Sequence, residues 1–151
     1  MSNLASPDLT QHAPRSPHVG LGGYVHLPRL LDKARAHIAG KAGEYHYNCP
    51  MDKHLFEFLG IDHEELLNKI KSGSDADVVA YTAPFVHKKS DADIAAFNKE
   101  AVASGPAAGS DGEKYFKELL GQVAPDRSDI TSWADLLDLD EKRSVPQRVA
   151  A

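Results

Sequence analysis

Cysteine, aromatic residues, basic charge and long apolar runs are all scarce in this chain of 151 residues. Its one cysteine, Cys49, cannot form an internal disulfide, which excludes a disulfide-stapled fold, and a four-cysteine zinc site is excluded as well. No run of about 18 apolar residues is present, so we expect no membrane span. With 17 Lys and Arg against 22 Asp and Glu, we expect no nucleic-acid partner, because such affinity comes mainly from basic side chains that neutralise phosphates.

What remains is the composition of an ordinary single domain, with 42% hydrophobic residues. Residues 1–14 have no basic start followed by an apolar stretch, so we expect an extended or partly disordered lead-in and no signal peptide. We predict one helical domain over residues 15–143 and a C-terminal tail over 144–151. The single cysteine and the absence of an export signal make the cytoplasm the expected compartment.

Helix start signals recur along the chain and predict an all-α fold. A small capping residue followed three positions later by a carboxylate can satisfy the free N–H groups of a first helical turn. This pattern occurs at Asp62/Glu65, Ser74/Asp77, Ser90/Asp93, Ser110/Glu113 and Ser132/Asp135. Two more helices are expected to begin at Pro28 and Pro50, because proline is well tolerated in the first turn. We therefore predict a single compact domain of six or seven short helices.

Some local features modify this prediction. Pro84 is expected to end its helix after one or two turns, and the glycine-rich stretch Val19–His26 is expected to hold a short extended pair. Charged residues on the helix after Pro28 are interpreted as its solvated face. The same interpretation is given to four acidic residues near the C-terminus, Asp135, Asp138, Asp140 and Glu141.

Several short motifs are similar to those of a known family. They are R-S-P (15–17), L-G-G-Y (21–24), G-E-Y-H-Y-N-C-P (43–50) and the closing T-S-W-A-D-L-L-D-L-D-E (131–141). The chain resembles a bacterial family that is described only as a domain of unknown function, over about residues 8–143. The resemblance implies a single bacterial domain and brings no activity with it.

Cys49 is the residue on which a catalytic hypothesis depends. If Pro50 begins a helix, Cys49 is its N-cap, where unpaired N–H groups and the helix dipole favour a thiolate. His46 is predicted as its base or ion-pair partner, with Tyr45 as a further catalytic group. Tyr47 and Asn48 are predicted to bind the substrate through hydrogen bonds. The alternative is a buried cysteine that merely caps a helix, with the tyrosines packed on the core.

Eight histidines are unusually many for this length, and five of them lie between residues 18 and 54. A metal site could draw on His18, His26, His46, His54, Glu44, Glu57 and Cys49. No pair follows the H-x-x-x-H spacing, and His54 with Glu57 is the only pair with helical spacing. We therefore assign no metal ligand and name no cofactor, and we interpret the histidines other than His46 and His54 as surface residues.

A third candidate is a site for an anionic ligand near the start of the domain. Basic side chains could hold an anion, the arginines through bidentate forks, and the nearby glycines would let backbone N–H groups approach it; these side chains are Arg15, Arg29, Lys33 and Arg35. Tyr24, which follows those glycines, is included as a substrate-binding candidate. Arg15 is the stronger arginine candidate because Pro14 and Pro17 stiffen the segment around it.

Two classes of function remain open. The first is a small cytoplasmic enzyme that acts on a small polar or anionic metabolite, with the cysteine and a nearby histidine in the site. The alternative is a non-catalytic module that binds a ligand, a metal or a partner with the same surface. A structural homo-oligomer is a third interpretation.

Overall fold

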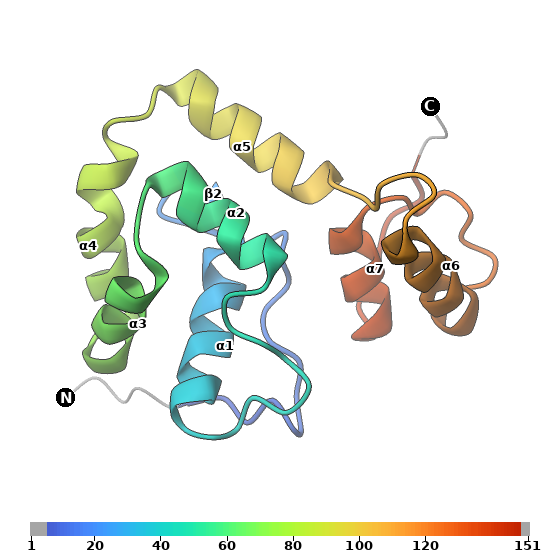
Figure 1. Cartoon of the computed structure of the whole chain (residues 1–151), viewed down its shortest axis with the longest axis horizontal. Helices are drawn as coiled ribbons and strands as arrows, with labels where there is room; N and C mark the ends of the chain where they lie inside the picture. The colour runs from blue at the N-terminus through green and yellow to red at the C-terminus, as the bar shows by residue number, and fades with distance from the viewer. Residues whose placement is uncertain (1–5, 149–151) are drawn as a thin grey trace.

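Seven helices and one short hairpin make up the computed structural model of residues 6–148 (Figure 1). The hairpin pairs β1 (Gly20–Leu21) with β2 (Tyr24–Val25). The helices are α1 (Leu27–Ile38), α2 (Pro50–Leu59), α3 (His63–Ser72), α4 (Asp75–Val86), α5 (Asp91–Ala103), α6 (Asp111–Val123) and α7 (Trp133–Asp140). The predicted all-α fold is thus confirmed. The outer ends of the predicted lead-in and tail, residues 1–5 and 149–151, lie outside the described residues.

All five helices predicted from capping residues begin where expected. The side chains of the predicted caps accept hydrogen bonds from backbone N–H groups of the first turn in α3, α4, α5, α6 and α7. In α4, for example, Ser74 accepts from the N–H of Asp77, and Asp77 accepts in return from the N–H of Ser74. These bonds join residues three positions apart, which is why the sequence pattern alone located them.

The predicted end of α4 at Pro84 is wrong. The helix runs through Pro84 to Val86, and the N–H of His87 still bonds to the carbonyl of Ala83 at 2.9 Å. Pro84 lies in the last turn, where the chain loses one helical hydrogen bond and does not need to continue far beyond the ring.

The expected extended pair is the β1–β2 hairpin, which turns through Gly22 and Gly23. Both glycines have positive φ, 70° and 96°, a region that other residues adopt reluctantly. Asn98 of α5 holds the hairpin, since its side chain accepts from the N–H of Val25 and donates to the carbonyl of Gly23.

The main hydrophobic core lies between α1 and the helices α2 to α5. On α1, Leu27, Leu30, Leu31 and Ala34 are fully buried, at the i, i+3, i+4 and i+7 spacing of one helical face. Burying each leucine contributes about 1.5–3 kcal/mol. They pack against residues of the following helices, among them Leu55, Leu66, Ile70, Val78 and Phe97.

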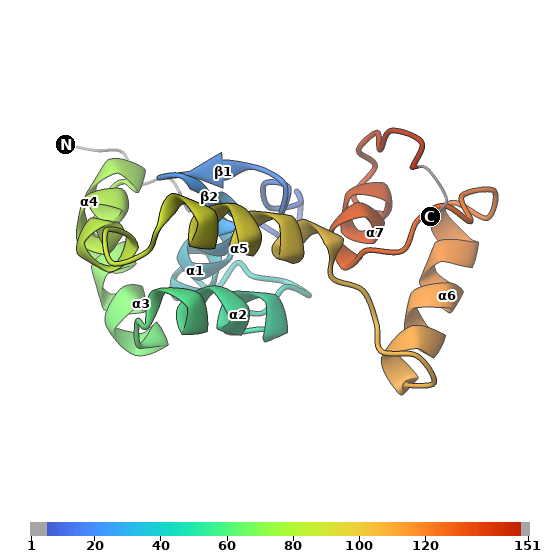
Figure 2. The ribbon, with the colours of Figure 1, turned by 90° about the horizontal axis from the view of Figure 1, so that it is seen from above.

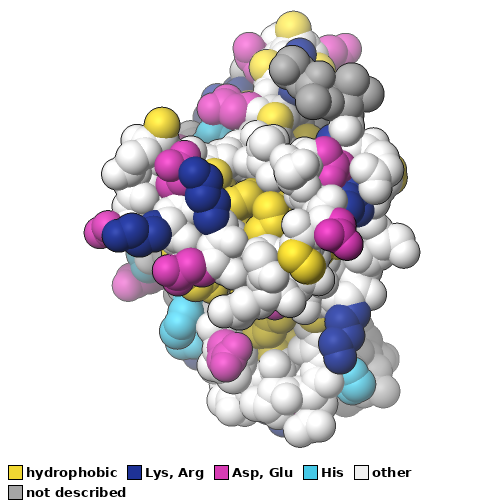
Figure 3. Space-filling model, turned by 90° about the vertical axis from the view of Figure 1, so that its right-hand side faces the viewer, with side chains coloured by type: hydrophobic (Ala, Val, Ile, Leu, Met, Phe, Trp, Pro, Cys, Tyr) yellow, Lys and Arg dark blue, Asp and Glu magenta, His cyan; other side chains and the backbone are white. Residues whose placement is uncertain are grey.

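A smaller core lies at the other end of the molecule, where α6 packs on α7. Its buried members are Phe116, Ile130, Leu136 and Val145. Figures 1 and 2 show that α5 runs across the main helical body and leads to this end. On the end face, hydrophobic side chains gather near the middle with charged ones around them (Figure 3). The surface of α6 also carries a largely apolar hollow of about 500 Å³.

Candidate functional site

Asp52 is the centre of a buried polar cluster at the N-terminal end of α2. Its side chain is fully buried, and its two oxygens accept from four donors. These are His26 Nε2 at 2.6 Å, Lys33 Nζ at 2.8 Å, and the backbone N–H groups of Asn48 and Cys49 at 3.0 and 3.3 Å. Burial alone raises the pKa of Asp52, but the bond from His26 and the charge of Lys33 outweigh it and lower the pKa to about 2.

His26 presents an imidazole nitrogen that has no partner. The side chain is 3% exposed, and its backbone has a φ of 77°, which is uncommon for a residue other than glycine. Because the ionised Asp52 can only accept, Nε2 carries the proton of the bond between them, and burial lowers the pKa of His26, so that the ring is neutral. Nδ1 therefore keeps its lone pair, and it is buried without a hydrogen bond to any residue in 6–148.

Lys33 joins Asp52 to the cysteine. Cys49 is the N-cap of α2 and Pro50 is the first helical residue, as predicted. The Lys33 side chain is 4% exposed, and its ammonium group donates to Cys49 Sγ at 3.0 Å. An ammonium group at this distance stabilises negative charge on sulfur. The charged group beside Cys49 is therefore Lys33 of α1, which the sequence analysis assigned to a solvated face.

None of the predicted partners around Cys49 forms a hydrogen bond with its sulfur within residues 6–148. The His46 side chain is exposed and has no hydrogen-bond partner in the described part of the chain. Tyr47 donates from its hydroxyl to the carbonyl of His63 at 2.8 Å, and burial raises its pKa. Asn48 contributes its backbone N–H to Asp52. Of this segment, only Cys49 and the backbone of Asn48 join the buried cluster.

Tyr45 belongs to a second cluster, which ties α1 to the end of α7. Arg29 donates to both oxygens of Glu141, at 2.9 and 2.7 Å, and each of these side chains is 3% exposed. The Tyr45 hydroxyl donates to Glu141 at 3.2 Å, and its ring centroid lies 5.5 Å from the Arg29 guanidinium. Burial and the charge of Glu141 raise the pKa of Tyr45 to about 12, so the phenol stays protonated at neutral pH.

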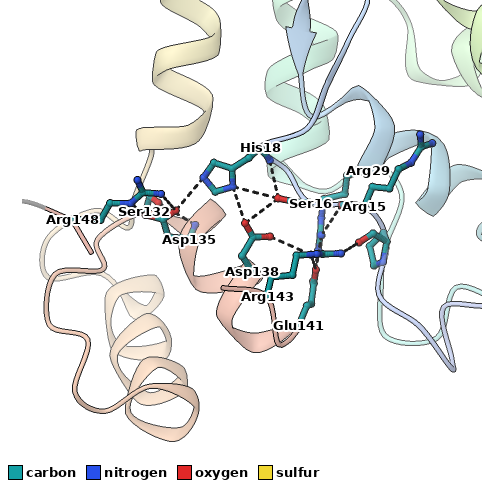
Figure 4. A network of polar contacts seen from close by, with 11 residues as sticks. Arg15, Ser16, His18, Arg29, Ser132, Asp135, Asp138, Glu141, Arg143 and Arg148 are labelled. Atoms are coloured by element: carbon teal, nitrogen blue, oxygen red, sulfur yellow. Dashed lines mark hydrogen bonds and ion pairs between the residues drawn. The ribbon is translucent and has the colours of Figure 1, made fainter. Parts of the chain in front are cut away.

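The acidic residues of α7 are not the solvated face that the sequence suggested. Asp135 and Asp138 are 5% and 6% exposed, and of the four acidic residues near the C-terminus only Asp140 is exposed. Basic groups pair with these buried carboxylates, His18 from the N-terminal segment and Arg143 from just after α7 (Figure 4). His18 bridges two of them, with Nδ1 2.9 Å from Asp138 and Nε2 3.0 Å from Asp135.

The groups predicted to bind an anion are already paired within the chain. Arg15 donates to Asp32 at 3.0 Å and to Asp75 at 3.2 Å, and these bonds hold the N-terminal segment on α1 and α4. Arg29 is occupied by Glu141, as described above. Tyr24 is 1% exposed and donates to Thr82 at 2.9 Å, so it faces the core. Within the described residues, these side chains therefore secure the fold through partners of their own.

A cavity of about 240 Å³ borders the Asp52 cluster. It lies between the start of α2, the end of α5 and the start of α7, and His26, His54, Glu100, Ser104 and Trp133 are among its lining residues. His54 Nε2, like His26 Nδ1, is buried without a hydrogen-bond partner among residues 6–148. Buried polar atoms are rarely left unpaired, so two unpaired imidazole nitrogens at one cavity indicate a place for a ligand.

A wider hollow, of about 670 Å³, lies beside Tyr45. Its lining includes Glu44, Asp140 and Glu141 together with the N-terminal segment Leu9–Ala13. Within the described residues, none of its lining side chains has a buried polar atom that lacks a partner. We therefore assign the candidate site to the smaller cavity.

Three members of the site were not assigned to it from the sequence: His26, which was a candidate metal ligand only, Lys33, which was a candidate for anion binding only, and Asp52, which was not a candidate. Asp52 had a usable signal, because it follows Cys49 by three positions, the same spacing as the other helix caps. His26 was interpreted as a surface residue, and that interpretation is wrong, since α2 covers it. No local pattern reports such a contact across 26 positions.

No group of three or more His, Cys, Asp or Glu side chains within residues 6–148 is arranged to hold a metal ion. Over the same residues, every helix is too short or too polar to cross a bilayer.

Comparison with known proteins gives a family and no activity. The chain has no match among curated proteins. A family described as a domain of unknown function (DUF5069) matches residues 11–143, which is most of the chain. The family resemblance inferred from the sequence is therefore confirmed, and the chain belongs to the DUF5069 family.

Proposed function

We propose that this protein is a small enzyme that acts on a small polar metabolite, with Cys49 and His26 as its reacting side chains. The observation that carries the proposal is a continuous line of contacts from sulfur to imidazole. Cys49 Sγ is 3.0 Å from Lys33 Nζ, Lys33 Nζ is 2.8 Å from Asp52, and Asp52 is 2.6 Å from His26. The histidine in this proposal is His26, in place of the His46 expected from the sequence.

The burial of this cluster supports a chemical role. Removing a charged side chain from water costs several kcal/mol per ion, and pairing recovers that cost only where the geometry is good. If helix capping were the only need, a serine would meet it, as Ser74, Ser90, Ser110 and Ser132 do in this chain. Clusters that combine burial with perturbed pKa values are frequent in active sites.

Each group in the line has a defined capacity. The sulfur of Cys49, which Lys33 contacts at 3.0 Å, can act as a nucleophile or as an acid–base group. His26 can accept a proton at Nδ1, while Asp52 fixes its orientation and tautomer. Pro50, which follows Cys49 in the chain, lines the cavity, so Cys49 is one residue away from the lining. The thiol must remain reduced, which fits the cytoplasm.

The test is the rate at which iodoacetamide alkylates Cys49 at pH 6. We expect alkylation on the order of tenfold faster than that of free cysteine, because only the thiolate reacts. Lys33→Met should abolish this advantage, Lys33→Arg should largely retain it, and Lys53→Met on the exposed side of α2 should leave it unchanged. Thermal unfolding of each variant confirms that it is folded. Alkylation that stays slow until the protein is unfolded would contradict the proposal.

A non-catalytic binding module is the second candidate. Two observations favour it: Lys33 already donates to the Cys49 sulfur, and Cys49 is not one of the residues that line the cavity. In that case a ligand would occupy the cavity and Cys49 would only cap α2. Slow alkylation of Cys49 in a protein whose cavity still binds a ligand is the result expected for such a module.

A further inference from the structure

The cavity beside His26 can hold only a small molecule. Its volume is about 240 Å³. Since a water molecule occupies about 30 Å³ in the liquid, this space corresponds to about eight waters or to a ligand of similar size. The walls include the apolar rings of Trp133 and Pro50.

The unpaired polar atoms of this cavity mostly accept hydrogen bonds. His26 Nδ1 is an acceptor, because its Nε2 holds the ring proton against Asp52. Glu100 contributes a carboxylate, and Ser104 a hydroxyl that can accept or donate. His54 Nε2 is also unpaired, within residues 6–148. A ligand that satisfies this set needs N–H or O–H donors of its own.

The charge around the cavity favours a cation. Among the residues 6–148 that line the cavity, Glu100 is the only acidic one, and none is a lysine or an arginine. Helix α5 ends at Ala103 beside the cavity, and the C-terminal end of a helix carries partial negative charge. Trp133 also lines the cavity, and indole rings attract cations.

Two helix N-termini near the cavity would favour an anion, but both are already capped. At α2, Asp52 accepts from the N–H groups of Asn48 and Cys49, and Pro50 has no N–H. At α7, Ser132 accepts from the N–H of Asp135. Groups of the chain itself therefore already interact with the partial positive charge at these helix ends.

The surface beyond the cavity continues the negative character. A hollow of about 470 Å³ adjoins it and shares His54 and Glu100 with it. Glu57 and Asp93 also line this hollow, against one lysine, Lys89. An incoming cation would thus meet carboxylates along its path.

We propose that this cavity binds a small organic cation with N–H donors, a primary ammonium compound, between Glu100 and the unpaired nitrogens of His26 and His54. The inference rests on the proposed function, in that it takes the same cavity as the substrate site. It narrows the polar metabolite of that proposal to a positively charged amine. It also excludes an anionic metabolite, the kind of ligand that the arginines suggested in the sequence.

The test is isothermal titration of the full chain at constant ionic strength with three probes of equal length: n-butylammonium, 1-butanol and butyrate. We expect n-butylammonium to bind with a Kd on the order of 1 mM, 1-butanol at least about tenfold more weakly, and butyrate not at all. The ring nitrogen signals of His26 and His54 should shift in nuclear magnetic resonance spectra when the ammonium is added.

Glu100→Gln should weaken ammonium binding by about tenfold or more, which is the loss of one charge partner. Glu118→Gln, an exposed glutamate on α6, is the matched control and should not change it. Tighter binding of butyrate, unchanged affinity in Glu100→Gln, or no ammonium binding up to about 100 mM would overturn the inference. Lys33-dependent alkylation of Cys49 is measured without the ammonium. If that alkylation persists while the ammonium fails to bind, the cavity inference alone is wrong.

Discussion

Asp52 combines two roles that other residues of this chain perform separately. It stands at the third position of α2 and caps the helix, and it also pairs with Lys33 and His26. Four donors on one carboxylate leave it little freedom to turn. Two residues that contact Asp52 have a positive backbone φ, which is 77° at His26 and 69° at Asn48. Such backbone strain is often found at functional sites.

The acid stability of the protein should depend on Asp52. The pKa of Asp52 is about 2 in the folded protein and lies near its ordinary value of 3.8 in the unfolded chain. Its contribution to stability is therefore complete above about pH 4 and is lost as the pH falls toward 2. We expect the loss to be on the order of 2 kcal/mol of unfolding free energy, measured by urea denaturation.

In Asp52→Asn, the unfolding free energy should not show this decrease between pH 4 and pH 2. Asp77→Asn, at the exposed cap of α4, should still show it. If the uncapped Asp52→Asn variant is too unstable for denaturation, the carboxyl carbon of Asp52 is titrated by nuclear magnetic resonance in the unaltered protein. A midpoint near 4 would show that the His26 and Lys33 contacts do not stabilise the carboxylate.

At the scale of the elements, short-range capping sets where the helices begin. Ser90 is representative: it accepts from the N–H of Asp93 at 3.0 Å, and Asp93 accepts from the N–H of Ser90 at 3.2 Å. This cap orients α5, whose far end forms one wall of the cavity. The same helix holds the β1–β2 hairpin through Asn98, so its start affects both the hairpin and the site.

Ser90→Ala should lower the free energy of unfolding by about 1 kcal/mol, because one N–H of the first turn loses its acceptor. Chemical denaturation measures the change. Ser128→Ala is the control, since Ser128 is exposed and its side chain has no hydrogen bond within the described residues. An equal effect in both variants would mean that the Ser90 cap adds nothing to stability.

For the whole molecule, the decisive contacts join the N-terminal segment and α1 to α7. Arg29 donates to both carboxylate oxygens of Glu141, and His18 bridges Asp135 and Asp138 (Figure 4). Pro17, next to His18, and Trp133, at the start of α7, both line the cavity. The network therefore fixes one side of the candidate site as well as the docking of the C-terminal end.

The His18 contact should make this docking dependent on pH. Both ring nitrogens face carboxylates, which requires the doubly protonated ring, and the hydrogen bond to Asp138 with the nearby charges raises the pKa of His18. The contribution of His18 to stability is thus complete below its unfolded pKa of about 6.5 and is lost as the pH rises through the folded value. Arg148, which pairs with Asp135, opposes the shift in part.

His18→Gln should therefore lower the unfolding free energy more at pH 6 than at pH 8. Urea denaturation at both pH values measures this difference, with His12→Gln, an exposed histidine, as the control. A destabilisation that is the same at both pH values would show that His18 is not charged in the folded protein.

The sequence by itself determined the helical fold and where most helices begin. Caps, prolines and glycines act over three or four residues, so their effects can be read without knowing the tertiary structure. The same locality placed Cys49 at the start of α2. It did not identify Lys33 as the neighbour of Cys49, because the two are 16 positions apart.

Only the tertiary structure decided which charged residues are buried and where the cavity lies. Arg29 and Glu141 are 112 positions apart, and His18 and Asp138 are 120 apart. In sequence, each of these residues has the pattern of a solvated helix face or a surface histidine. Burial of such a group is tolerable only when a partner of opposite charge arrives with it, and the packing of α7 against the N-terminal half brings that partner.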